Sequence, residues 1–160
     1  MVLLEEFKDI NLLQGFSPLC QRQLASLATS KVCLPGSCIF QEGDHERHVY
    51  VVAEGEVILE IKVPSIGIVQ VHQIGAGDLL GWSPILGRGW MTATARALTP
   101  CRLIALDAEQ VRALVERDTR FGMEFFRSIA SALADRLRAT RLQLPDPRQH
   151  PMLGMSEGAD

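Results

Sequence analysis

Between Lys31 and Asp107 the chain is built from short runs of β-forming residues that glycine- or proline-containing turns separate. The runs cover residues 37–40, 49–52, 56–63, 66–74, 92–99 and 101–106. In the third run Val57, Leu59, Ile61 and Val63 fall on one face and Glu56, Glu60 and Lys62 on the other, which predicts a strand with one apolar face. Short strands with such frequent turns predict an antiparallel sandwich, jelly roll or barrel.

Helical patterns flank this region on both sides. Ser17-Pro18 is a helix start signal, and the first thirty residues read as short helices. Asp107 with Gln110 predicts a second capped helix start. A longer helix is expected from about 118 to 144, where Pro145 ends it. We therefore expect one domain over residues 1–144, with the barrel at about 31–107, and a flexible tail over residues 145–160.

The long helix carries a second apolar stripe with heptad spacing. The stripe, called the seam below, consists of Phe126, Ala130, Leu133, Leu137, Thr140 and Leu144. Phe121, Phe125 and Ile129 already supply a face that can pack on the sheet. The seam therefore predicts a homodimer in which two copies of this helix pack together.

Composition and charge narrow the function classes. The chain has 16 Lys and Arg against 19 Asp and Glu, a net charge of −3, which disfavours direct DNA binding. No apolar run reaches the roughly 20 residues of a membrane span, and Glu5 and Glu6 lie where a signal peptide carries cations. The four cysteines have no CxxC spacing and are expected to be free thiols in the cytoplasm. No catalytic triad or P-loop is present, so no enzyme is predicted.

Four segments in order form a recognisable pattern: Pro35-Gly36-x-x-Ile39-Phe40-x-Glu42-Gly43-Asp44, Val49-Tyr50-Val51-Val52-x-x-Gly55-x-Val57, Gly77-Asp78-Leu79-Leu80-Gly81 and Ala95-Arg96-Ala97. The pattern resembles the cyclic nucleotide-binding domain of Crp/Fnr regulators and of protein kinase A regulatory subunits, over about residues 7–144. The resemblance implies a mainly β fold, an eight-stranded jelly roll with N-terminal helices and a long C-terminal helix. Its glycines, above all Gly81, are expected at turns that need a positive φ or close backbone approach.

The resemblance also implies a phosphate-binding cassette after Gly81. In nucleotide-binding members, backbone N–H groups hold the cyclic phosphate, a glutamate binds the ribose and an arginine pairs with the phosphate. Here Trp82 takes the glutamate's position, Met91 takes the arginine's, and Pro84 removes one backbone donor. The ligand-binding residues that the resemblance implies are Gly81, Trp82, Ser83, Arg88, Met91, Thr92, Ala93 and Thr140.

These departures predict weak or absent binding of cyclic AMP. Loss of a charged partner of the phosphate costs about 2–5 kcal/mol, roughly a thirty- to several-thousand-fold loss in affinity. Arg88, between two glycines, is one alternative source of charge if its loop turns inward. Trp82 and Trp90 either line a pocket for a flat ligand or fill the space of the nucleotide. The expected ligand is a cyclic nucleotide or another small molecule, with no cofactor identified.

Two other readings remain open. A ligand-free module would keep the fold only for dimerisation and partner docking. A metal-dependent cupin would need converging histidines, but His45 and His48 lie in a predicted turn and His72 is isolated, so no metal site is predicted. An iron–sulfur cluster is disfavoured because only Cys20 lies near the N-terminus. No helix-turn-helix follows the long helix, so we expect a stand-alone domain with a protein partner, or a truncated regulator.

Overall fold

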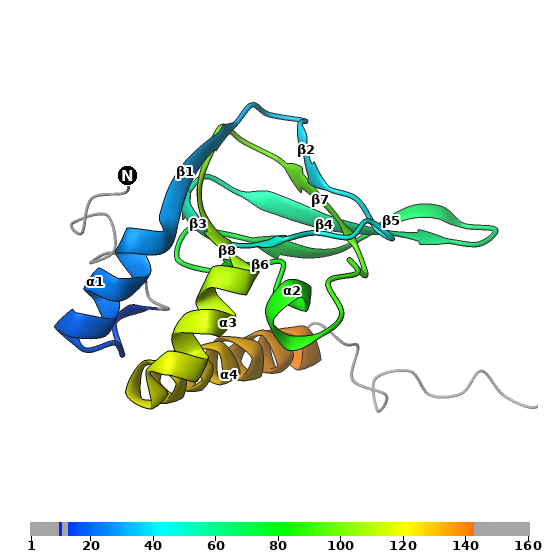
Figure 1. Ribbon diagram of the computed structural model, residues 1–160. Helices are drawn as coiled ribbons and strands as arrows, with labels where there is room; N and C mark the ends of the chain where they lie inside the picture. The colour runs from blue at the N-terminus through cyan, green and yellow to red at the C-terminus, as the bar shows by residue number, and fades with distance from the viewer. Residues whose placement is uncertain (1–9, 11–12, 143–160) are drawn as a thin grey trace, which may run out of the picture.

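The computed structural model describes residue 10 and residues 13–142, and it forms a small β-barrel with helices along one side (Figure 1). Leu144 of the seam and the tail at residues 145–160 lie outside the described residues. The elements in order are α1 Pro18–Leu27, β1 Ala28–Cys33, β2 Cys38–Phe40, β3 His48–Glu54, β4 Val57–Val63, β5 Gly67–Ile74, β6 Leu79–Leu80, α2 Ser83–Leu86, β7 Thr94–Ala97, β8 Cys101–Asp107, α3 Ala108–Arg117 and α4 Thr119–Leu142. The eight-stranded fold with flanking helices is confirmed.

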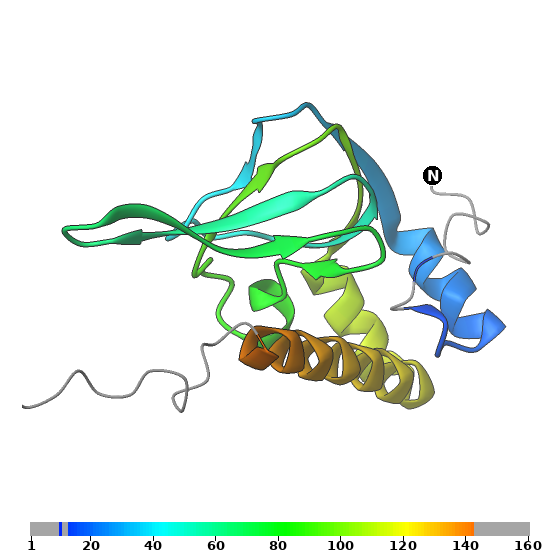
Figure 2. The same cartoon turned by 180° about the vertical axis from the view of Figure 1, so that it is seen from behind.

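The strands form two four-stranded antiparallel sheets. One has the order β1-β8-β3-β6 and the other β2-β7-β4-β5. The outer half of the β4–β5 hairpin projects beyond the rest of the barrel, as Figures 1 and 2 show. A bulge between Leu59 and Glu60 interrupts the pairing of β4 with β5. Only Val57 of the predicted apolar face is buried, because the strand beyond the bulge leaves the barrel.

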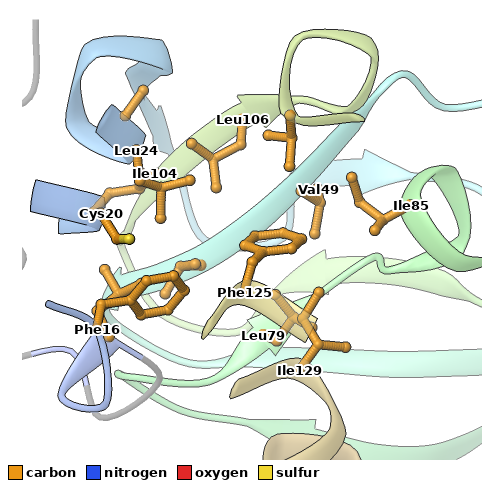
Figure 3. Packing of buried hydrophobic residues seen from close by; sticks show 14 of the residues in the cluster. Phe16, Cys20, Leu24, Val49, Leu79, Ile85, Ile104, Leu106, Phe125 and Ile129 are labelled. Carbon is orange, nitrogen blue, oxygen red and sulfur yellow. The ribbon is translucent and has the colours of Figure 1, made fainter. Parts of the chain in front are cut away.

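Two apolar clusters lie on opposite faces of the first sheet. Val49 and Val51 of β3 contribute to a helix-side cluster, which includes Phe121, Phe125 and Ile129 of α4 (Figure 3). Tyr50 and Val52 of the same strand contribute to a cluster inside the barrel. Residues of one strand alternate between the two faces, so β3 is apolar along most of its length.

The predicted helix starts are confirmed. The Ser17 hydroxyl accepts a hydrogen bond from the Cys20 N–H at the start of α1. The Asp107 carboxylate accepts from the Glu109 and Gln110 N–H groups at the start of α3. Asp118 accepts from the Phe121 N–H at the start of α4. Side-chain oxygens thus satisfy amides that a helix start leaves unpaired.

The main error of the helical reading is at residues 28–30. They belong to β1, which pairs with β8 from Ala28↔Leu106 to Cys33↔Cys101. Residues 29–32 of β1 are exposed, so no apolar alternation marks the strand in the sequence. Pairing with β8 decides its conformation. None of the helices in the described part of the chain is both long and apolar enough to cross a membrane.

Candidate functional site

The cassette segment connects β6 to β7 and begins at Gly81. Gly81 has φ +70°, and a Cβ atom there would lie 3.0 Å from Cε1 of Phe40. The next residues form α2, a single turn whose Ile85 packs in the helix-side cluster among the residues of Figure 3. The predicted requirement for glycine at position 81 is confirmed.

Backbone groups of the cassette largely satisfy one another. The Ile85 and Leu86 N–H groups donate to the Trp82 carbonyl oxygen, at 2.9 and 3.0 Å. The Gly87 and Gly89 N–H groups donate to the Ser83 carbonyl oxygen. Pro84 has no N–H to offer. These amides are therefore engaged within the cassette, and an incoming phosphate would have to compete for them.

Met91 lies inside the barrel. It is 4% exposed and belongs to the same cluster as Phe40, Tyr50 and Leu80. Its backbone is held in place, since the Met91 N–H donates to the Asp44 carbonyl and the Met91 carbonyl accepts from Gly43. The position that the resemblance assigns to the arginine is thus filled by an apolar side chain in apolar surroundings.

Arg88 is exposed and borders a cavity of about 350 Å³ between the cassette and α3, which Met91 does not line. Arg47 and Arg112 line the same cavity, and the Arg112 guanidinium donates to the Pro84 carbonyl. Arg88 makes no hydrogen bond or ion pair with any residue of the described chain. The structure does not bring Arg88 together with Met91.

The two tryptophans pack on different neighbours. Trp90 is 58% exposed, and its ring meets His45 edge-on with the centroids 5.2 Å apart. Trp82 is half-buried against the helix-side cluster. They do not form one stacking pocket. Thr92 is exposed and Ala93 half-buried.

Arg136 of α4 is the residue that sequence reasoning missed. Its guanidinium lies 4.6 Å from the centre of the Trp82 ring and donates to the Leu79 carbonyl oxygen. Burial lowers the pKa of Arg136. Burial and the Arg136 charge both lower the pKa of His72. The signal was its place seven residues after Ile129, on the continuation of the core-facing stripe.

Most of the other α4 predictions fall on an exposed face. Phe126 is 40% and Leu137 53% exposed, and Ala130 is exposed as well. Leu133 is half-buried against the helix-side cluster. The Thr140 hydroxyl donates to the Arg136 carbonyl of its own helix at 2.9 Å.

The histidine run considered for a metal has other contacts. Glu46 accepts hydrogen bonds from the Arg47 and His48 backbone N–H groups, and these bonds offset the effect of burial and lower the pKa of Glu46. Within residues 13–142, no group of three His, Cys, Asp or Glu side chains is placed to hold a metal ion.

Comparisons with known proteins agree with this architecture. Residues 31–118 match the family model of the cyclic nucleotide-binding domain. A candidate potassium channel protein of Rhodopseudomonas palustris is 31% identical over 83 residues, which are 52% of this chain and 20% of that protein. The chain thus spans about a fifth of the length of this relative.

Solved structures show the same fold. The N-terminal domain of a transcriptional regulator from Streptomyces coelicolor is 25% identical with a TM-score of 0.68, over 96% of this chain and 99% of that one. A cyclic nucleotide-binding domain from Methylobacillus flagellatus is 21% identical with a TM-score of 0.78, over 90% and 86% of the two chains. The chain belongs to the cyclic nucleotide-binding domain family, in the form found in Crp/Fnr-type regulators.

Proposed function

We propose that this chain is a regulatory sensor domain whose cassette binds cyclic AMP weakly or not at all. The observation that carries the proposal is Met91, buried in the barrel where the family resemblance calls for an arginine. A phosphate placed beside it would lose its charged partner, at a cost of about 2–5 kcal/mol. Arg88 does not replace that partner, since it borders the cavity toward α3.

Isothermal titration calorimetry with cyclic AMP and with cyclic GMP tests the cassette. We expect no saturable heat at micromolar concentrations of either nucleotide. Low-micromolar binding of either one would show that the cassette binds the nucleotide without the glutamate and the arginine.

The seam supports a homodimer as the signalling form. Phe126, Ala130 and Leu137 are exposed on one face of α4, although Phe121 and Phe125 already fill its core-facing side. Exposed apolar residues at heptad spacing favour a second copy of the same helix as the partner.

The proposed signal passes through the junction of α3 and α4. Asp118 ends α3 and caps α4, and it also accepts a hydrogen bond from the Gln23 side chain at 2.9 Å. A ligand that shifts the cassette would change the angle of α4 at this junction and the surface that the dimer shows to a protein partner. This role is regulatory rather than enzymatic, is placed in the cytoplasm and involves no direct contact with DNA or membrane.

A ligand-free docking module is the second candidate. It is favoured by the internal hydrogen bonds of the cassette and by the contact between Arg136 and Trp82. Thermal unfolding in the presence of a panel of cyclic nucleotides and other nucleotides separates the two. A shift in Tm with any of them favours the sensor, whereas an unchanged Tm throughout favours the module.

A further inference from the structure

We propose that a groove between α4 and β5 is a binding site for a small phosphorylated molecule. The groove, called the α4–β5 groove below, has a volume of about 650 Å³. Small-molecule sites typically span roughly 300–1,000 Å³. Its donors are His72 of β5 and Arg127, Ser128, Ser131 and Arg136 of α4. None of the implied cassette residues lines it, so the site goes beyond the proposed function.

Two arginines supply the positive charge of this groove. Arg127 has no hydrogen bond or ion pair with any described residue, and Arg136 forms no ion pair there. Nη1 of Arg136 is buried and has no hydrogen-bond partner in the described chain. Burying a guanidinium that forms no ion pair costs folding free energy, and a bound anion would reduce that cost.

The three carboxylates that border the groove each accept a hydrogen bond from another residue of the chain. Glu124 accepts from the Ser17 N–H at 2.8 Å and pairs with Arg120. Asp135 pairs with Arg138 at 2.7 Å. Asp78 accepts from the Gly75 N–H at 3.2 Å. Glu124 and Asp135 are therefore paired with arginines other than Arg127 and Arg136, whereas the charge of Asp78 acts on Arg136 without forming an ion pair with it.

The α4 serines add neutral donors between the two arginines. Ser128 and Ser131 are three residues apart on one side of α4, and their hydroxyls have no hydrogen-bond partner among residues 13–142. Guanidinium and hydroxyl groups in one concave surface match the several acceptor oxygens of a phosphate group.

Dimerisation would leave the α4–β5 groove open. At about 100° per residue, Ser131 and Asp135 point roughly opposite to Phe126 and Leu137 of the seam. The groove and the seam therefore lie on different sides of α4, and the binding of a ligand can be measured separately from dimerisation.

The test is calorimetry of the whole chain with inorganic phosphate and with glycerol 3-phosphate, each against potassium chloride at the same ionic strength. We expect saturable binding of at least one phosphate compound and none with chloride. Arg136→Gln should weaken binding at least about tenfold, since a hydrogen bond to a charged group is worth about 1.5–3 kcal/mol. The control Arg141→Gln, at an exposed arginine of the same helix that does not line the groove, should leave it unchanged.

Arg136→Gln also removes the contact with Trp82, so a second pair of variants keeps that contact intact. Arg127→Gln and Ser131→Ala should each weaken phosphate binding severalfold without lowering Tm. A weak site has a Kd of about 1 mM. Absence of saturable binding at phosphate concentrations up to about 10 mM would therefore overturn the proposal. Equal affinity in wild type and in Arg127→Gln and Ser131→Ala would overturn it as well. The cassette proposal is tested with cyclic nucleotides and none of its residues lines the groove, so failure of the cassette proposal and failure of the groove proposal remain distinguishable.

Discussion

The guanidinium of Arg136 lies over the ring of Trp82, 4.6 Å from its centre, and so joins α4 to the cassette. The same guanidinium donates to the Leu79 carbonyl just before the cassette begins. α4 passes beside α2 and β6 in both views of the fold (Figures 1 and 2). One side chain thus couples the two elements that the proposed signalling mechanism moves.

Arg136→Gln should loosen both elements. A cation held over a partly buried indole contributes about 0.5–2 kcal/mol, and the variant loses this contact. We expect faster amide hydrogen exchange in residues 82–86 and in the last turns of α4. Arg138→Gln, whose arginine is exposed and pairs only with Asp135, serves as the control. Exchange that rises equally in both variants would contradict a specific coupling role.

Introducing the glutamate and arginine that the family resemblance implies should strengthen nucleotide binding. Trp82→Glu combined with Met91→Arg should raise the affinity for cyclic AMP by at least about thirtyfold, since the pair is worth about 2–5 kcal/mol. Met91→Arg alone should lower Tm without ligand, because it buries an unpaired charge. Met91→Leu, which conserves volume, should have little effect. A folded double variant with no measurable affinity in calorimetry would show that positions 82 and 91 do not face the nucleotide site.

The turns and helix starts of this fold were predictable from the sequence, whereas its long-range contacts were not. The turns at Gly43, Gly55, Gly77 and Gly81 were predictable because only glycine adopts positive φ cheaply, and all four have positive φ. The helix caps at Ser17 and Asp107 followed from local hydrogen bonding in the same way.

Long-range packing was the part that local pattern could not supply. The place of Arg136 on the core-facing side of α4 follows from its spacing to Ile129, but only the packing of α4 beside the cassette places it on Trp82. Arg88 was a candidate for the phosphate, but the fold directs its loop toward α3. β1 carries no apolar alternation, and its pairing with β8 depends on residues that are far away in the sequence, from Ala28↔Leu106 to Cys33↔Cys101.

Gly55→Ala should strongly destabilise the barrel. Gly55 has φ +90°, and a Cβ atom there would overlap the Pro100 carbonyl oxygen and lie 2.8 Å from Cys101 Sγ. We expect a loss of at least about 2 kcal/mol in the free energy of unfolding, measured by urea denaturation. Gly75→Ala is the matched control, since nothing lies within 4 Å of a Cβ at that position. Similar losses in the two variants would refute the steric explanation.

Acid should remove the contribution of Glu124 to stability. The Ser17 N–H, which donates to Glu124, is the main cause that lowers the pKa of this carboxyl from 4.5 to about 2. A lowered folded-state pKa stabilises the fold above the unfolded value and loses that effect as the pH falls. The difference in unfolding free energy between wild type and Glu124→Gln should therefore be constant above about pH 5.5 and shrink between pH 4.5 and 2. A difference that stays constant from about pH 5.5 to pH 2 would contradict this role of Glu124.

A charge in the seam should separate the proposed dimer into folded monomers. Leu137 is 53% exposed in the single chain, so Leu137→Glu costs the isolated domain little, whereas in a dimer it places two like charges beside the helix contact. We expect sedimentation equilibrium to give a dimer for wild type and a monomer for the variant, with Tm of the variant independent of protein concentration. Ser131→Glu puts the same charge on the opposite side of α4 and should remain dimeric. A monomeric wild-type chain would contradict the proposed dimer. A Leu137→Glu variant that stays dimeric would show that the dimer contact lies outside the seam.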